Sequence, residues 1–413
     1  METVDDMENR IVVECPDVSR NKITYNYCVT GAWKDAFTDI RTFDVVYDTD
    51  ISSIPSGVAI IPMIANILPV AWIYDAYIKI QTCDKDFYES IPTFKEGYMK
   101  MYPAIDFRGK LEVGQVVNYD VEDKEGAIVF FSGGVDSFDT LIRHQKEMPV
   151  LLSLWGADLT LQDECGWLNV KQRMSHTAQE FGILGLTAKS GFRDFLNYDI
   201  LGKKIKESKD NWWHGFQHGI GIISHSAPVA YVLKKKNVYL ASSYTDQERP
   251  FLTCASAPSI DNKVKFFGCK IWHDGYEYTR QEKIAHILQY TVEHEYKVFL
   301  RVCWEKTDGL NCCQCEKCFR TLSAIYAEGF VPKEYGFEYT QSMLLQLKER
   351  IEKNRGIVIS PVYELCYRDI QKRMRENYRK EEVCDGLKWF YDVDIKRICK
   401  KSVVKRLIEK VKK

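Results

Sequence analysis

Two glycines followed by a carboxylate and a hydroxyl give the first indication of chemistry in this sequence. An apolar run at 127–131 leads directly into the segment S-G-G-V-D-S. The run predicts a strand buried on both faces, and the glycines allow a tight turn that brings backbone amides close to a ligand. The turn opens a helix, whose N-terminal amides attract anions, so a site for a polyphosphate and its Mg²⁺ is predicted. The residues of this site are Ser132, Gly133, Gly134, Val135, Asp136 and Ser137.

The turn is not a Walker A loop, because that would need G-x-x-x-x-G-K-[ST] and no lysine stands at the helix start. It resembles the S-G-G-x-D-S signature of the PP-loop ATP pyrophosphatases. The resemblance implies that ATP is cleaved between its α and β phosphates and that an acceptor oxygen is adenylated. Catalytic roles follow for Ser132 and Ser137 on phosphate oxygens and for Asp136 on Mg²⁺. The alternative is an ordinary strand–turn–helix with a capping side chain.

Cysteines form the second pattern. Five of the 14 cysteines fall between positions 303 and 318, and four of them have the spacing C-x8-C-x2-C-x2-C. Four thiolates at such spacing can close a tetrahedral shell around a structural Zn²⁺. A ferredoxin-type cluster would need a further cysteine at position 322, which is Leu322. Reduced, buried cysteines are the other alternative to a zinc site with the ligands Cys303, Cys312, Cys315 and Cys318.

The turn and the cysteine spacing together resemble the 7-cyano-7-deazaguanine synthase family over residues 127–330. The resemblance implies ATP and Mg²⁺ as cofactors, a structural zinc and a role like that of queuosine biosynthesis. Family members adenylate 7-carboxy-7-deazaguanine, admit ammonia to form an amide, and activate the amide to give the nitrile. Branches with added domains occur in bacterial defence clusters, so a protein-borne carboxylate is a second candidate substrate.

The substrate region departs from that family. The family's P-G-R-N segment is replaced by residues 213–221, which contain no arginine. His214 and His218 in this segment are candidates for acid–base or phosphate contacts, or they pack within a helix. The loop after the fourth predicted strand keeps Tyr244, Asp246 and Arg249 at a different spacing, and these are the other candidate substrate contacts.

Strands and helices alternate from residue 126 onward, which predicts an α/β fold with a doubly wound parallel sheet of the PP-loop type. Ligands bind such sheets at the carboxyl ends of the strands, so Leu154 and Trp155 are further candidate nucleotide contacts. The predicted strands are 149–154, 185–188 and 238–241, and the predicted helices are 137–144, 170–181, 224–233 and 279–290.

Three units are predicted along the chain. Residues 1–125 form an added N-terminal α+β domain, with strands at 22–30 and 42–47 and helices at 71–78 and 84–101. Residues 126–335 form the PP-loop domain with its four-cysteine zinc site. Residues 336–413 form a helical, basic tail, which is interpreted as a solvated face rather than as a contact for RNA or membrane.

Composition excludes several classes of protein. The formal net charge of −1 gives no overall attraction to nucleic acid or membrane. The acidic N-terminus has no basic, apolar leader, and the most apolar stretch, 57–72, contains Pro62 and Pro69 and is too short to span a bilayer. A cytoplasmic protein is therefore expected, with a homodimer left open.

Three functions remain. The first is an ATP-dependent, AMP-forming ligase or synthase, in which a small-molecule or protein carboxylate attacks the α-phosphate and an amine or ammonia displaces AMP. The second is a PP-loop tRNA-modifying thiolase, which would need reactive cysteines or an Fe–S cluster. The third is a non-catalytic nucleotide-binding module.

Overall fold

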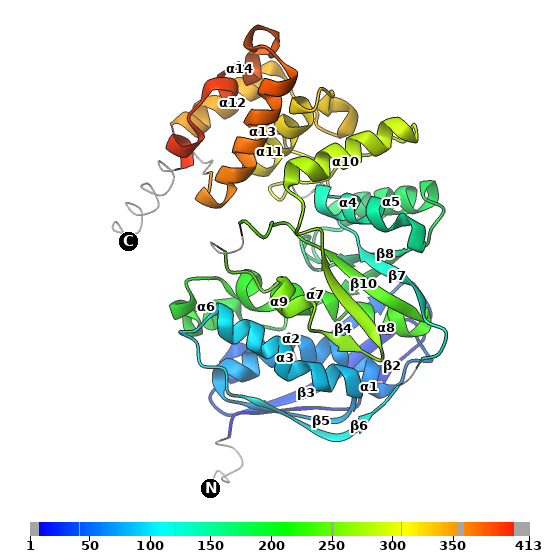
Figure 1. The fold of residues 1–413 in the computed structure, drawn as a ribbon. Coiled ribbons are helices and arrows are strands. Elements are labelled where there is room, and N and C mark those ends of the chain that lie inside the picture. The colour runs from blue at the N-terminus through cyan, green and yellow to red at the C-terminus, as the bar shows by residue number, and fades with distance from the viewer. Residues whose placement is uncertain are drawn as a thin grey trace.

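The computed structural model describes residues 8–40, 42–119, 121–248, 252–306, 308–353 and 359–399. Helices cover a large mixed sheet, so the predicted α/β class is confirmed (Figure 1). In the described ranges the sheet contains twelve strands: β1 (Arg10–Val13), β2 (Asp17–Val18), β3 (Lys22–Thr30), β4 (Thr42–Tyr47), β5 (Tyr77–Asp84), β6 (Lys110–Val117), β7 (Glu125–Phe130), β8 (Val150–Trp155), β9 (Gly185–Ser190), β10 (Lys235–Ala241), β11 (Lys265–Phe266) and β12 (Cys269–Asp274).

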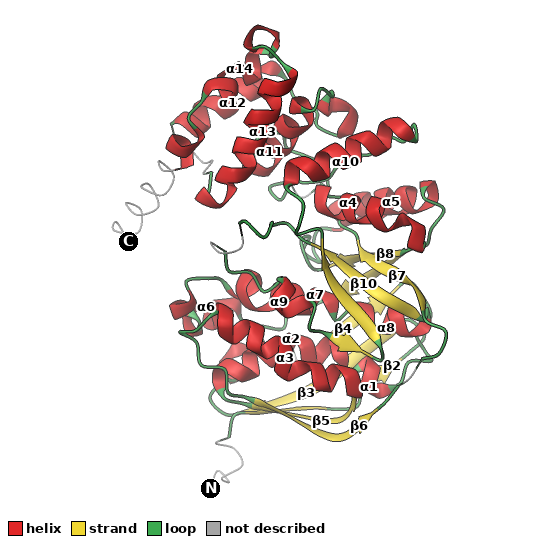
Figure 2. Cartoon of the chain, in the orientation of Figure 1, coloured by secondary structure: helices red, strands yellow, loops and turns green. Residues whose placement is uncertain are grey.

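Most of the α-helices are interspersed with these strands, and the last five, α10 to α14, follow them (Figure 2). The α-helices are α1 (Ser56–Ala59), α2 (Ile61–Tyr74), α3 (Lys85–Met101), α4 (Val135–His144), α5 (Glu164–Glu180), α6 (Tyr198–Lys204), α7 (His218–Ile223), α8 (Ser226–Val232), α9 (Pro258–Asp261), α10 (Arg280–Glu293), α11 (Glu316–Ala327), α12 (Gln341–Glu352), α13 (Glu364–Asn377) and α14 (Asp385–Asp392). A π-helical turn, η5, covers Trp213–Gln217. Short 3-10 helices are η2 (Lys34–Ala36), η3 (Gln145–Glu147), η4 (Lys206–Ser208), η7 (Pro332–Tyr335), η8 (Pro361–Tyr363) and η9 (Lys380–Glu382).

The parallel part of the sheet has its first strand in the middle. Strand β7 pairs in parallel with β8 on one side and with β10 on the other, and β9 and β12 follow outward. The chain therefore winds first in one direction and then in the other. Such a reversal leaves a crevice at the carboxyl ends of the two middle strands, where ligands bind in open α/β sheets. The S-G-G-V-D-S turn follows β7 at this crevice, and the loop from Ser242 follows β10.

Side chains of β7 and of Phe131, the residue after it, alternate between two hydrophobic cores. Ile128 and Phe130 belong to one core, and Val129 and Phe131 belong to the other. Helices α4 and α5 pack on the face of the sheet that carries Val129, and α8 packs against β10 (Figure 1). Burial on both faces explains why this segment is apolar without interruption.

The N-terminal strands extend the same sheet. Strand β4 pairs antiparallel with β9, with Val45 opposite Ser190, and β3, β1, β5 and β6 follow in that order. Side chains of this segment also share the core that contains Ile128 and Phe130. The sheet and the core both run across residue 125, and the domain boundary placed there stays a prediction.

Helix α2 accounts for the apolar stretch that precedes β5. Every residue from Ile61 to Ile73 is buried, as expected for a helix that is apolar on all sides. The second half of the predicted helix 71–78 is wrong, because Asp75 adopts a left-handed conformation (φ 50°) that ends α2 and Tyr77 begins β5.

The C-terminal helices α11 to α14 gather at the end of the molecule opposite the N-terminal strands (Figure 1). The core that contains Val129 also contains side chains from these helices, among them Phe319, Tyr367 and Phe390. Residues 354–358 and 400–413 of the predicted tail lie outside the described residues, and the tail as a unit stays a prediction. No helix in the described ranges combines the length and the apolar composition needed to cross a bilayer.

Replacing Ile64 by alanine tests the packing of α2. Ile64 is 0% exposed, whereas Ile40 is 43% exposed and serves as the matched control. Truncating a buried isoleucine leaves a cavity, so we expect Ile64→Ala to lower the free energy of unfolding by about 3 kcal/mol. Ile40→Ala should change it by less than about 0.5 kcal/mol. Urea denaturation followed by circular dichroism measures both, and equal losses would contradict the buried position of α2.

Candidate functional site

The turn after β7 is held in shape by its own serines. Gly133 has a φ of 74°, and Gly134 precedes the first residue of α4. The Ser137 hydroxyl donates to the Gly134 carbonyl at 3.1 Å and lies 3.3 Å from the Ser132 hydroxyl. Ser137 is buried and Ser132 is exposed, so Ser137 orders the turn while Ser132 is accessible to a ligand. No described side chain caps α4, which leaves its first amides available to an anion.

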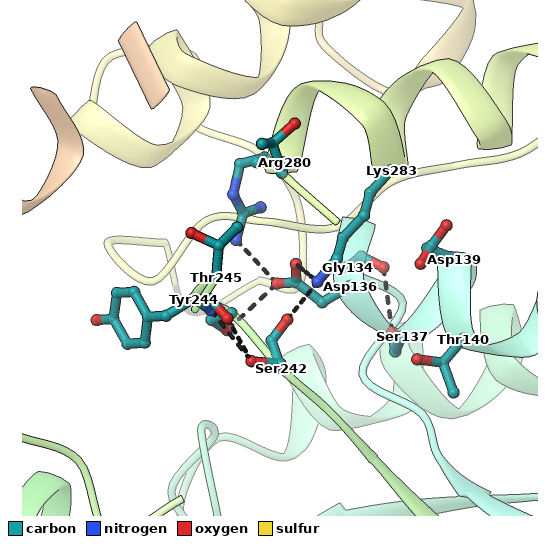
Figure 3. A network of polar contacts seen from close by, with 12 residues as sticks. Gly134, Asp136, Ser137, Asp139, Thr140, Ser242, Tyr244, Thr245, Arg280 and Lys283 are labelled. Carbon is teal, nitrogen blue, oxygen red and sulfur yellow. Dashed lines mark hydrogen bonds and ion pairs between the residues drawn. The ribbon is translucent and has the colours of Figure 1, made fainter. Parts of the chain in front are cut away.

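Asp136 faces two cations from α10 (Figure 3). Arg280 donates from Nη2 to Oδ2 of Asp136 at 2.8 Å, and Lys283 Nζ lies 3.5 Å from Oδ1. The Ser243 hydroxyl also donates to Oδ2, at 3.2 Å. Lys283 donates in addition to the Ser242 carbonyl at 2.6 Å. These contacts join α4, α10 and the loop after β10 at the point where the sheet reverses direction.

The charges around Asp136 fix its ionisation. Burial raises the pKa of this carboxyl, but the charges of Arg280, Lys283 and Lys317 outweigh burial and lower the pKa to about 2. The Arg280 and Lys283 side chains are only 6% and 2% exposed. Lys317 also interacts with Asp158, and Lys283 also interacts with Asp139. Cations gathered beside the open amides of α4 favour a bound anion such as a phosphate group.

The sequence predicts a helix over 279–290 but no role for Arg280 or Lys283. The signal is present in the sequence as a capping box, in which Thr279 and Glu282 each accept the other's backbone N–H. A helix that begins at Arg280 places the two cations three residues apart on one face of its first turn. The sequence is thus sufficient to pair them with each other, but not with Asp136.

A cavity of about 200 Å³ adjoins the turn. Its walls are largely aromatic and aliphatic, with two arginines, and they include Ser132, Gly133, Phe138, Arg173, Phe299 and Arg301. Leu154 and Trp155 are not among the lining residues. Trp155 instead stacks on Trp167 at a centroid distance of 5.3 Å, and its indole N–H donates to the Thr160 carbonyl. The two residues lie at the carboxyl end of β8, the same edge of the sheet as the turn.

The loop after β10 holds the other predicted contacts. Tyr244 is partly buried, its ring points away from Asp136 (Figure 3), and burial raises the pKa of its phenol. Asp246 is exposed, and its backbone N–H donates to the Tyr276 carbonyl. Arg249 lies outside the described residues.

His214 lies on the π-helical turn η5, and His218 begins α7 directly after it. The His214 Nδ1 atom lies 3.1 Å from Oδ1 of Asp210, a partner that the sequence does not predict. Hydroxyls of Tyr102 and Thr253 each donate to Oδ2 of Asp210 at 2.8 Å. Asp210 thus holds the imidazole of His214 in one orientation. The Nδ1 atom of His218 is buried and has no hydrogen-bond partner among the described residues.

The four predicted zinc ligands converge. Their sulfur atoms all lie within 4.8 Å of one another, and the separations are 4.0 Å for Cys303–Cys315 and 3.9 Å for Cys312–Cys318. Tetrahedral Zn–S bonds of about 2.3 Å place sulfur atoms about 3.8 Å apart. The residues therefore fit a Zn²⁺ ion, and no other described group of His, Cys, Asp or Glu side chains forms a comparable cluster.

Backbone amides support this cysteine centre. Asn311 fixes the segment, because its side chain donates to the Leu300 and Gly336 carbonyls. Cys315 caps α11, so one ligand sits at the start of a regular helix. Three amides donate to ligand sulfurs: Glu305 to Cys303 at 3.4 Å, Gln314 to Cys312 at 3.3 Å and Cys318 to Cys315 at 3.4 Å.

Elemental analysis of cysteine variants tests the metal centre. We expect one zinc per wild-type chain and almost none in Cys315→Ser, because a serine hydroxyl replaces a thiolate ligand. Cys313→Ser is the matched control: this neighbour is also buried, but its sulfur lies near the Asn311 carbonyl, outside the cluster. It should keep its zinc. Iron in place of zinc, or equal metal loss in both variants, would contradict a zinc site built from these four cysteines.

Comparison with known proteins identifies no family for this chain. No protein-family model matches the chain, and a search of curated proteins found no match either. The function is therefore inferred from the geometry of the turn after β7 and of the four-cysteine cluster.

Proposed function

We propose that this chain is an ATP-dependent, AMP-forming ligase that activates a carboxylate at the crevice beside β7 and β10. The observation that carries the proposal is the group of three cations, Arg280, Lys283 and Lys317, around Asp136 at the first turn of α4. A glycine turn with open amides at the same point supports a phosphate ligand. This combination supports the resemblance to PP-loop ATP pyrophosphatases.

The phosphates would bind along the turn. Amides of residues 132–135 and the exposed Ser132 hydroxyl would face the phosphate oxygens. Arg280 and Lys283 would neutralise the pyrophosphate as it departs, since cations in a buried site stabilise developing charge more than they do in water. The cavity beside Ser132 and Gly133 has the aromatic walls that suit a nucleotide base.

Asp136 fits the predicted role of a magnesium ligand. Its Oδ1 atom is buried and has no hydrogen-bond partner among the described residues, although Lys283 lies 3.5 Å away. A carboxylate kept ionised in this way is the type of ligand that Mg²⁺ takes beside substrate phosphates. When bound, Mg²⁺ supplies further charge neutralisation for the leaving group.

A substrate carboxylate would then attack the α-phosphate, and an amine or ammonia would displace AMP from the acyl adenylate. The substrate is 7-carboxy-7-deazaguanine or a carboxylate borne by a protein. The resemblance to 7-cyano-7-deazaguanine synthase is supported by a cluster of four cysteines at the predicted positions. The departures at 213–221 and after β10 weigh against an identical substrate.

Asp136→Asn tests the proposed chemistry. With ATP, Mg²⁺ and 7-carboxy-7-deazaguanine, we expect pyrophosphate release to fall by about 100-fold or more, because a ligand to the phosphate–magnesium group is lost. The matched control is Asp17→Asn, an exposed aspartate in β2, which should keep the wild-type rate. ADP and phosphate as products would contradict the proposal. Tight ATP binding without AMP from the wild-type chain would favour the non-catalytic module.

Arg280→Met tests the cation group separately. Loss of one charge-assisted hydrogen bond removes about 1.5–3 kcal/mol, so we expect ATP to bind roughly 10- to 100-fold more weakly by titration calorimetry. Arg368→Met on α13, whose side chain is 49% exposed, should bind ATP like the wild-type chain. Unchanged affinity in Arg280→Met would place the phosphates elsewhere.

A further inference from the structure

A cysteine for which the sequence predicts no role interacts with the two histidines. Cys254 is 6% exposed and follows the loop after β10. Its neighbours Thr253 and Ala255 contact Asp210 and the His214 carbonyl, and its thiol interacts with the imidazoles of His214 and His218. Because His214 uses Nδ1 for Asp210, its Nε2 atom is the nitrogen left for Cys254. The order carboxylate, imidazole, thiol is that of a nucleophile activated by an oriented base.

The three members are fixed by separate contacts. Thr253, next to the cysteine, donates to Asp210, and Tyr102 from the loop after α3 does the same. The Ala255 amide donates to the His214 carbonyl at 2.8 Å, which ties the cysteine segment to the π-helical turn. Turns of this kind occur frequently at functional sites.

The ionisation of the pair suits a nucleophile. Burial raises the pKa of the Cys254 thiol, but the hydrogen bonds from His214 and His218 outweigh burial and lower the pKa to about 6. The bonds to Asp210 and Cys254 raise the pKa of His214 to about 10. At neutral pH the pair is therefore a thiolate beside an imidazolium. The other titratable groups that interact with this cluster are Tyr98, Tyr102, Tyr244 and Asp158.

Two alternative roles for this cluster fit less well. A metal site would bring the ligand atoms together, yet among the described residues only the four cysteines from 303 to 318 form such a group. A purely structural position would not need a buried ion pair, since removing two charges from water costs several kcal/mol per ion and apolar residues fill such sites at lower cost.

The cysteine lies at the same edge of the sheet as the proposed ATP site. Tyr244, just after β10, interacts electrostatically with Cys254. Asp158, just after β8, interacts with His218 and also with Lys317, and Lys317 interacts with Asp136. The two centres thus lie near each other beside the carboxyl ends of β8 and β10, and the proposal is that an activated acyl group passes from one to the other.

We propose that Cys254, with His214 as its base and Asp210 as the residue that positions His214, is an acyl-accepting catalytic site that forms a thioester. The acyl donor is the acyl adenylate, and in this respect the inference rests on the proposed function. The acceptor of the acyl group from the thioester is an amine.

Atoms and charge balance in this transfer. The Cys254 sulfur attacks the carbonyl carbon, a C–S bond forms, and the C–O bond to phosphate breaks so that AMP leaves with the electron pair. AMP leaves as its dianion, and His214, which no longer faces a thiolate, releases its proton to solvent. The amine then attacks the thioester, His214 takes the amine proton, and Cys254 leaves as the thiolate.

Alkylation and acylation test the thiol without the natural substrate. Peptide-resolved mass spectrometry of the full chain follows iodoacetamide labelling across pH and acetylation by p-nitrophenyl acetate. We expect Cys254 to be labelled with a midpoint near pH 6 and to take up one hydroxylamine-labile acetyl group. In His214→Ala the labelling midpoint should move toward about pH 8.5, the ordinary thiol value, and acetylation should slow by about 100-fold. Asp210→Asn should move the same midpoint in the same direction.

The controls separate this inference from the proposed function. His294→Gln, an exposed histidine at the end of α10, should match the wild-type chain in both assays, and Cys254→Ser should take up no acetyl group at position 254. Chelator should change neither rate. If Cys254 stays unlabelled, or titrates alike with and without His214, the acyl-accepting site is wrong. With ATP, Mg²⁺ and 7-carboxy-7-deazaguanine, full amide formation by Cys254→Ser would overturn it while leaving the ligase intact. If the wild-type chain forms no pyrophosphate while Cys254 is still labelled as expected, the result contradicts the proposed ligase and not the acyl-accepting site.

Discussion

The ion pairs between Asp136 and the cations of α10 are the contacts on which the rest of the site depends. Asp136 lies in the first turn of α4, and Arg280 and Lys283 lie in the first turn of α10, so charge pairing aligns two helix N-termini over the sheet edge. Removing one partner of a buried pair costs about 3–5 kcal/mol. Since α10 packs on α4 and α11, the same pairs connect the cysteine centre to the sheet.

Local pattern was enough to predict much of the fold. The runs that form β7 and β8 are recognisable because each is short, apolar and followed by a segment with helical periodicity, and β10 because it is short and apolar. The error at 71–78 arose where two elements meet with only two residues between them: α2 is apolar on every side, so nothing in its pattern marks its end before β5. The pairing of β4 with β9 could not be predicted, because long-range strand pairing leaves no local signal.

The residues of the site also fall into two groups: those that the sequence predicts and those that only the structure reveals. The glycine turn and the four cysteines are each encoded within a short segment, and spacing alone is sufficient to single them out. Arg280, a partner of Asp136, comes from a helix 144 residues further along the chain, and Asp210 and Cys254 are brought together by a turn and a loop that are separate in sequence. His214 and His218 are recognisable as a pair from the sequence, but only the tertiary structure shows that the Cys254 thiol interacts with both.

The pairing of β4 with β9 has a consequence for aggregation. Without the N-terminal strands, β9 would become an edge strand with unpaired backbone groups from Ala188 to Ser190, next to an uncovered apolar face. Edges of this kind recruit strands from other molecules and lead to aggregation. The N-terminal strands therefore protect this edge of the sheet, and a shortened chain that begins at β7 is expected to aggregate.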